Sequence, residues 1–377
     1  MPHIAFFESR YAAHNPQEWA LRGSYKYPSL LGDLPRSVQT TILMRDLPPE
    51  DDPHRIALTR GKVRFREFDS NDDPRFWLAE ELSGEMKRYM TRIGAEIVSN
   101  LSGRVMGHNY AIAMSADALG LDYVYRVAGN DIETRGGVFE AEGHSFWGTA
   151  AQAVLAMQER MVVDIASRVI VMSRKEARRL ERIGARPDRL HVCMRGVDRS
   201  HFTPGPEPTG SCSRFLYVGR RSFEKGYDKI EAVAEDFADS HPDIDFTFAG
   251  WFEPRREGNR AYRSFVGFAD LPALYREQHA LVVCSRSEGF PQVIMEAMAC
   301  GLPCILSASL FGDDFTDGED CLLVGQDWRD VGEAVARLHG DRALYLKLRE
   351  GALARAERDF DETLNRAHYH RALMGQP

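Results

Sequence analysis

One stretch, residues 279–301, constrains the fold of this 377-residue chain more than any other, because it joins an apolar run to a bounded helix. The run at 279–284 is rich in β-branched residues, which is typical of a strand covered on both faces in a parallel sheet. A polar loop follows at 285–290. Pro291 suits the first position of a helix and Gly301 suits a left-handed stop. The stretch therefore predicts a strand, a loop and a helix over about 291–300 in an α/β domain.

The predicted helix carries two polar side chains in an otherwise apolar sequence after its proline. These are Gln292 and Glu296, which are four residues apart and so lie on one face. A buried carboxylate without a partner costs several kcal/mol or becomes protonated. We expect the hydroxyl groups of a ligand to provide that partner. Pairing of Glu296 with a neighbouring arginine or a backbone amide in the core is the alternative.

A second carboxylate, Glu288, lies in the loop before this helix. Ligands of open α/β sheets bind at the carboxyl ends of the strands, where this loop is expected. The N–H groups of Gln292 and Val293 open the helix and form an anion site that the helix dipole strengthens. One stretch thus offers an anion site flanked by two hydroxyl acceptors, Glu288 and Glu296. A sugar nucleotide has this layout of diphosphate, ribose and sugar.

Composition sets the outer limits of the interpretation. With 44% hydrophobic residues, the chain can form two α/β domains with large cores. A net charge of -8 argues against nucleic acid as a partner. No basic leader opens the sequence, and no apolar run reaches the ~18 residues of a membrane-spanning helix. We therefore expect a cytoplasmic protein with buried, reduced thiols. The cysteines are Cys193, Cys212, Cys284, Cys300, Cys304 and Cys321.

Strand and helix patterns alternate along the whole chain, which predicts doubly wound domains. The segment 204–211 is rich in proline and glycine and indicates a linker. We therefore expect an N-terminal Rossmann-like domain over 1–204 and a C-terminal one over 205–360. In the second domain, further strands are expected at 245–249 and 264–267.

A second candidate loop, residues 219–226, follows the predicted first strand of the C-terminal domain. Arg220 and Lys225 flank the carboxyl end of that strand. A guanidinium and an ammonium in this position can clamp adjacent phosphates, each charged hydrogen bond contributing roughly 1.5 to 3 kcal/mol. The alternative is a surface charge pair with Glu224.

Other polar positions give weaker signals. His108 follows a predicted strand, and so do Asn130 and Asp131, which otherwise suit a turn and helix cap. The pattern Asp243-Ile-Asp245 precedes a strand instead of following one, so we interpret it as solvated and expect no metal site. The segment 174–189 is basic and could attract an anionic membrane surface or acceptor, which would make the protein peripheral at the inner face of the membrane. A solvated helix face is the alternative.

The residues described so far also carry a resemblance to a known family. Residues 287–303, SEGFPQVIMEAMACGLP, resemble the signature of the family 4 retaining glycosyltransferases (glycosyl transferases group 1), two glutamates separated by seven residues. The segment from Gly219 to Gly226 resembles the diphosphate segment of that family. The resemblance implies a GT-B fold, two doubly wound Rossmann-like domains facing a cleft. It also implies that the last helix, about 361–377, packs back on the N-terminal domain.

Family membership implies roles for individual residues. Glu296 would hold the ribose hydroxyls, Glu288 the donor sugar hydroxyls, and Arg220 and Lys225 the diphosphate. Gly23 would correspond to the glycine-rich loop of the family. Ala128 lies where relatives have a histidine that contacts the sugar or the β-phosphate. Further expected donor contacts are Gly289, Phe290, Gln292, Val293, Phe268, His108 and Asn130.

The implied activity is that of a metal-independent, retaining hexosyltransferase without a cofactor. It would move a sugar from a UDP-sugar or GDP-sugar to a hydroxyl of a glycan, lipid or small-molecule acceptor, in the synthesis of surface glycans or glycoconjugates. Catalysis would rest on leaving-group stabilisation and positioning. A nucleotide-sugar epimerase of similar fold and a catalytically silent nucleotide-binding subunit are the two alternatives, and Ala128 is the feature that admits the second.

Overall fold

The computed structural model describes residues 3–8, 34, 38–44, 63–67, 104–107, 110–118, 120–127 and 145–375. The chain divides into two compact units. Unit 1 comprises Met1–Met172, Glu176–Cys193 and Arg366–Pro377, and unit 2 comprises Ser173–Lys175 and Met194–Asn365.

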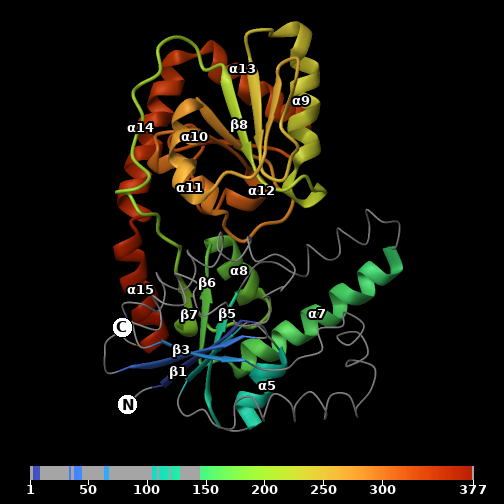
Figure 1. Cartoon of the computed structure of the whole chain (residues 1–377). Coiled ribbons are helices and arrows are strands. Elements are labelled where there is room, and N and C mark those ends of the chain that lie inside the picture. Colours follow the sequence, from blue (N-terminus) through green and yellow to red (C-terminus); the bar gives the residue numbers. More distant parts are fainter. Residues whose placement is uncertain are drawn as a thin grey trace. The chain divides into compact units, whose positions relative to one another are not determined.

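Unit 1 contains a parallel sheet with helices. Within the described ranges the sheet has seven strands in the order β3-β2-β1-β4-β5-β6-β7 (Figure 1). The order reverses at β1, which lies between β2 and β4, as in doubly wound folds. The strands are β1 His3–Glu8, β2 Gln39–Met44, β3 Val63–Glu67, β4 Arg104–Gly107, β5 Asp122–Arg126, β6 Arg168–Val171 and β7 Leu190–Val192. The helices are α5 Tyr110–Ala118, α7 Ser145–Ile165, α8 Arg174–Arg182 and the short η1 Pro187–Arg189.

The core of unit 1 forms where the apolar sides of strands and helices meet. Tyr123 of β5 and Val169 of β6 pack in one buried cluster with Ala113 of α5. The end of the last helix, α15 Glu362–Met374, also contributes to this unit. Tyr369 is buried there and its hydroxyl donates to the sulfur of Met106 at 3.1 Å.

Unit 2 has a sheet in the order β10-β11-β9-β8-β12-β13-β14, and its strands pair in parallel except at the β10 edge. The strands are β8 Arg214–Val218, β9 Asp245–Ala249, β10 Arg255–Glu257, β11 Arg260–Arg263, β12 Ala280–Val283, β13 Cys304–Ser307 and β14 Leu322–Val324. The helices are η2 Phe223–Lys225, α9 Tyr227–Ser240, η3 Phe268–Asp270, α10 Leu271–Glu277, α11 Gln292–Ala299, α12 Ala308–Phe311, α13 Trp328–Gly340 and α14 Arg342–Asp359.

Helices cover both faces of the unit 2 sheet. Figure 1 shows α9 on one side of β8 and α10 and α11 on the other. The apolar residues of α9 recur at helical spacing, and Ile230, Val233 and Phe237 are buried against the sheet as that spacing predicts. All six cysteines are buried free thiols, which confirms the predicted burial.

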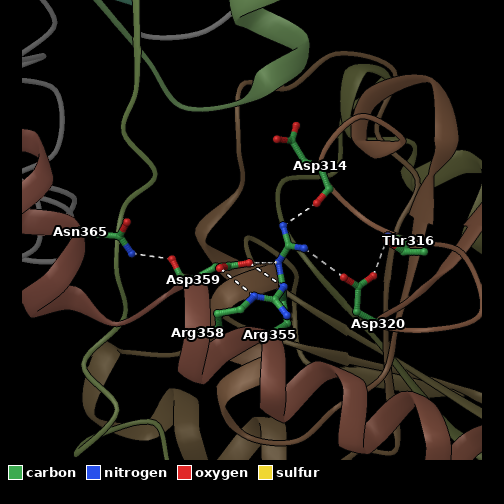
Figure 2. Close-up of polar contacts among 7 residues, drawn as sticks. All are labelled: Asp314, Thr316, Asp320, Arg355, Arg358, Asp359 and Asn365. Atoms are coloured by element: carbon green, nitrogen blue, oxygen red, sulfur yellow. Dashed lines mark hydrogen bonds and ion pairs between the residues drawn. The ribbon is translucent and has the colours of Figure 1, made fainter.

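A buried arginine fastens the end of α14. Arg355 is 6% exposed and donates to Asp320 Oδ2 at 3.2 Å and to the backbone oxygen of Asp314. Its Nε lies 2.8 Å from the carboxylate of Asp359, and Figure 2 shows the guanidinium between these groups. Breaking a buried ion pair of this kind by removing one partner is strongly destabilising. The cluster therefore joins the end of α14 to the loop before β14, and loss of one partner would leave a buried charge uncompensated.

The structure corrects one expected strand. Residues 264–267 do not form a strand, because β11 ends at Arg263 and pairs with the preceding β10 in a short hairpin. Gly258 turns this hairpin at a φ of 57°, a left-handed conformation that suits glycine. The sequence does not predict this hairpin, because hairpin prediction relies on alternating apolar residues and the residues on both sides of Gly258 are mostly charged.

Candidate functional site

The strand, loop and helix predicted at 279–301 are present in unit 2. All four residues of β12 are buried, and α11 follows after the loop. Pro291 has extended backbone angles and precedes the helix instead of occupying its first position. Gly301 adopts a φ of 82° and ends the helix as predicted. Its carbonyl accepts from the guanidinium of the buried Arg349 at 2.5 Å, so the helix end is tied to α14.

The carboxylate of Glu296 is buried within this helix and has a tyrosine as partner. The residue is 5% exposed, and the hydroxyl of Tyr275 on α10 donates to its Oε2 at 2.7 Å. Burial raises the pKa of Glu296 to about 7, although the Tyr275 hydrogen bond acts in the opposite direction. Its partner is thus a tyrosine hydroxyl, and not the arginine or the backbone amide of the alternative prediction. Sequence reasoning missed Tyr275, which lies 21 residues upstream on another helix.

Glu288 lies in the loop after β12 and forms an ion pair with Lys225 from the loop after β8. Side-chain exposures of 14% for Glu288 and 25% for Lys225 place the pair at a partly sheltered surface. The hydroxyl of Ser285 donates to the same Glu288 oxygen at 3.5 Å. Two residues predicted to hold different parts of one ligand are therefore in contact with each other.

The loop after β8 is pressed against the loop after β12 by a glycine. Gly226 has a φ of 68°, and a Cβ there would lie 2.1 Å from the carbonyl oxygen of Cys284. Only a residue without a side chain allows this approach. Arg220 stands at the other end of the loop, with 56% of its side chain exposed and Nη2 2.9 Å from Glu224. Arg220 thus forms the pair with Glu224 that was the alternative to phosphate binding. Its side chain nevertheless remains exposed to solvent.

The N-terminal turn of α11 has no side-chain cap on its amides. Gln292 instead accepts at its Oε1 from Nη1 of Arg195, at 3.2 Å. A guanidinium therefore lies beside Gln292 at the first turn of α11. Sequence reasoning did not include Arg195 among the site residues, because its contact with Gln292 joins positions 97 residues apart in the chain.

Two predicted aromatic contacts have other partners. Phe290 is 5% exposed and stacks on Phe315 with ring centroids 5.8 Å apart, so its side chain belongs to the core. Gly289 beside it is half-buried. Phe268 lies against His201, with centroids 4.2 Å apart, and its carbonyl oxygen is 3.0 Å from Nε2 of that histidine.

Several predictions concern residues on which the structure gives no site information. Gly23, His108, Ala128 and Asn130 lie outside the described residues.

Within the described ranges, no group of three or more His, Cys, Asp or Glu side chains could hold a metal ion. Asp243 lies beside His339 and Asp245 pairs with Arg256, with 64% and 44% of the two aspartate side chains exposed. No helix in the described part of the chain is long and apolar enough to cross a membrane.

The basic segment 174–189 is less uniformly exposed than its sequence suggests. The guanidinium of Arg179 is bound to the carboxylates of Glu159 and Glu176, and Glu176 is buried. Arg186 pairs with Asp188 at 2.7 Å on the surface. Arg178 and Arg182 are exposed on this segment. Part of the basic face therefore serves the packing of α8.

Comparison with known proteins finds a family match in the C-terminal part of the chain. Residues 210–355 match the family described as Glycosyl transferases group 1. The D-inositol 3-phosphate glycosyltransferase of Acidothermus cellulolyticus is 33% identical over 233 residues, 53% of this chain and 51% of that protein. Glycogen synthase of Mycobacterium tuberculosis is 26% identical over 273 residues, 68% of this chain and 65% of that protein. The chain spans about half the length of the D-inositol 3-phosphate glycosyltransferases that it matches first.

Solved structures cover the whole chain at low sequence identity. Sucrose-phosphate synthase from Thermosynechococcus elongatus has a TM-score of 0.71 at 17% identity, over 100% of this chain and 99% of that chain. Anabaena HepE in complex with UDP-glucose has a TM-score of 0.66 at 15% identity, over 99% of each chain. The predicted GT-B fold class and the resemblance to group 1 are therefore confirmed.

Proposed function

We propose that this chain is a group 1 glycosyltransferase, which binds a nucleoside-diphosphate sugar in unit 2 and transfers the sugar to an acceptor hydroxyl. One observation carries the proposal. The loops after β8 and β12 bring Lys225 and Glu288 into contact in the segment that leads into α11, so a cation, a carboxylate and a helix N-terminus without a cap from the Pro291 side chain occur together. The solved structures of Anabaena HepE with UDP and UDP-glucose support a donor of this class.

The diphosphate is assigned to the cationic part of the site. Lys225 and the exposed Arg220 come from one loop, and the first amides of α11 point along a helix dipole that favours an anion. Arg195 adds a guanidinium beside Gln292. Charged hydrogen bonds of this kind hold phosphate oxygens, and we propose that they replace a divalent cation at the diphosphate.

The ion pair between Lys225 and Glu288 can be kept when the donor binds. An ammonium has three N–H donors, so Lys225 can keep Glu288 while it turns other donors to phosphate oxygens. Glu288 has two oxygens and accepts from Ser285 as well as from Lys225. We assign its remaining acceptor capacity to hydroxyls of the donor sugar. Recognition of the diphosphate and of the sugar would then be coupled through one contact.

Glu296 is assigned to the ribose. Its Oε2 already accepts from Tyr275, which fixes the orientation of the carboxylate within the buried helix. Ribose hydroxyls would complete its hydrogen bonds and provide the ligand partner that the sequence predicts. The raised pKa of the carboxyl group is the consequence of keeping an acceptor buried at this position.

Retention of configuration is the stereochemical outcome that we propose. Glu288 is held by Lys225 and Ser285 and is assigned to donor hydroxyls, not to the anomeric carbon. The departing diphosphate oxygen then accepts the proton of the acceptor hydroxyl, on the face from which the diphosphate leaves. Catalysis would consist of stabilising that leaving group and positioning the two substrates.

A panel of UDP-sugars and GDP-sugars, scored by thermal shift, tests the binding step. A ligand at 100 times its dissociation constant stabilises the folded state by about 2.7 kcal/mol, which such a scan detects. Lys225→Met should reduce the shift, whereas Lys347→Met, which changes an exposed lysine on α14, should leave it unchanged. The proposal is wrong if no nucleoside diphosphate or its sugars shift the unfolding transition of the wild-type chain.

Turnover separates the proposed reaction from its two alternatives. Donor and a panel of glycan, lipid and small-molecule hydroxyl acceptors should yield a new glycoside, as in the synthesis of surface glycans or glycoconjugates. An epimerase would instead convert the donor alone to an isomer. A silent subunit would bind the nucleotide without turnover with any acceptor.

A further inference from the structure

Arg286 connects the two loops that carry the proposed donor-binding residues. It lies in the loop after β12, and its guanidinium reaches the segment 223–228 after β8. Nη1 donates to the carbonyl oxygen of Phe223 at 2.7 Å, and both terminal nitrogens donate to the carboxylate of Asp228 at 2.6 Å. The backbone N–H of Arg286 donates to the carbonyl oxygen of Glu224 at 2.8 Å. The guanidinium also lies 3.8 Å from the ring centroid of Phe223, a cation–π distance.

These contacts enclose the position of Lys225. Phe223 and Glu224 precede it and Asp228 follows it, and all three are held by Arg286. The partner of Lys225, Glu288, is two residues beyond Arg286 in the other loop. A shift of either loop would therefore change the distance between the ammonium and the carboxylate.

We propose that Arg286 is a positioning residue, which fixes the loop after β8 against the loop after β12 so that Lys225 and Glu288 face the donor together. The inference rests on the proposed function, since it concerns the same site. Arg286 itself does not need to touch the donor, because its fork is occupied by Phe223 and Asp228.

The chemistry of the contact requires arginine. A planar guanidinium can bind a carboxylate with two nitrogens, pack its face on an aromatic ring and donate to a carbonyl oxygen at the same time. A lysine keeps the charge but offers a single nitrogen. The side chains of Arg286 and Asp228 are 27% and 50% exposed, and ion pairs at such exposure contribute little to stability. Variants of this pair should therefore fold, which makes a functional test possible.

The first test compares Arg286→Lys and Asp228→Asn with a matched control. Arg255→Lys changes another arginine of unit 2 that lies 3.8 Å from an aromatic centroid, that of Tyr262, and binds a glutamate at 2.7 Å, but on the edge strand β10. Calorimetry should give a dissociation constant for nucleoside diphosphate about tenfold higher in the first two variants and unchanged in the control. The donor KM should rise by a similar factor, with kcat changing less than threefold.

The second test asks whether Arg286 acts through Lys225. In a Lys225→Met background, Arg286→Lys should change the dissociation constant of nucleoside diphosphate less than twofold, because the group that it positions is absent. Equal effects in the two backgrounds would overturn the positioning role. An unchanged affinity of Arg286→Lys in the wild-type background would also overturn it. A wild-type chain that binds no nucleoside diphosphate would instead refute the proposed function, and the inference with it.

Discussion

Replacement of Glu296 by glutamine should make the protein more stable at alkaline pH while weakening nucleotide binding. The carboxylate is buried, and burial raises its pKa from the ordinary value of 4.5 to about 7. Each pKa unit corresponds to 1.36 kcal/mol, so keeping this group ionised in the folded chain costs about 3 kcal/mol. Glutamine keeps an oxygen that can accept from Tyr275 but carries no charge.

The sign of the pH dependence follows from the direction of this pKa shift. Below pH 4.5 the group is protonated in both the folded and the unfolded chain, and the substitution should change the free energy of unfolding little. As the pH rises from 4.5 through 7, the unfolded chain loses this proton before the folded chain does, which lowers the stability of the wild type. The advantage of Glu296→Gln should therefore grow across this window and reach about 3 kcal/mol above it.

Urea unfolding of wild type and Glu296→Gln at several pH values between 4.5 and 8.5 measures this difference. Glu333→Gln, which changes an exposed carboxylate on α13, is the control and should leave the pH dependence unaltered. On the same samples, Glu296→Gln should weaken binding of nucleoside diphosphate by roughly 1 to 3 kcal/mol, because the ribose loses a charged acceptor. A stability difference that does not change with pH would refute the argument from burial, and unchanged affinity would refute the ribose assignment.

Three further predictions follow from the loops of unit 2. Gly226→Ala should destabilise the chain by at least about 2 kcal/mol in thermal or urea unfolding, because its backbone is left-handed and the new Cβ would lie 2.1 Å from the carbonyl oxygen of Cys284. Gly258→Ala is the control: its backbone is also left-handed, but the space around it is open, so this substitution should destabilise the chain less. EDTA after metal stripping should leave transferase activity largely intact, since cationic side chains are assigned to the diphosphate, and activity restored only by Mg²⁺ or Mn²⁺ would contradict that assignment. An α-linked donor should give an α-linked product by early NMR coupling at the anomeric proton, and a β-linked product from a gluco- or galacto-configured donor would overturn the proposed mechanism.

The elements around the site could be predicted from local patterns. The apolar run of β12, the stop at Gly301 and the helical spacing within α9 are each determined by nearby residues, and all are present. The rule that loops gather at the carboxyl ends of parallel strands also placed Lys225 and Glu288 at one edge of the sheet. Local pattern and topology together were therefore sufficient to bring Lys225 and Glu288 together, while their role in donor binding stays a prediction.

Side-chain pairing could not be predicted in the same way. Tyr275 reaches Glu296 because α10 packs beside α11, and no periodicity within either helix specifies that contact. Arg286 reaches Asp228 across 58 residues of sequence, and Phe290 enters an aromatic cluster although its loop was expected to face a ligand. Each of these contacts depends on how two elements pack, so the sequence identifies the residue types but not their partners.

The contact between Lys225 and Glu288 links these observations to the reaction. Without a donor, each charge compensates the other, so neither has to remain unpaired in a partly sheltered site. A donor with both a diphosphate and a sugar offers new partners to the cation and the carboxylate at once, whereas a free diphosphate offers a partner only to the cation. The coupling should therefore favour the intact donor over its nucleoside diphosphate product, provided that the two loops keep their register. A rigid connection such as Arg286 therefore has an energetic advantage. If the loops were mobile, Lys225 and Glu288 would separate, and the free-energy cost of ordering them again would lower the affinity for the donor.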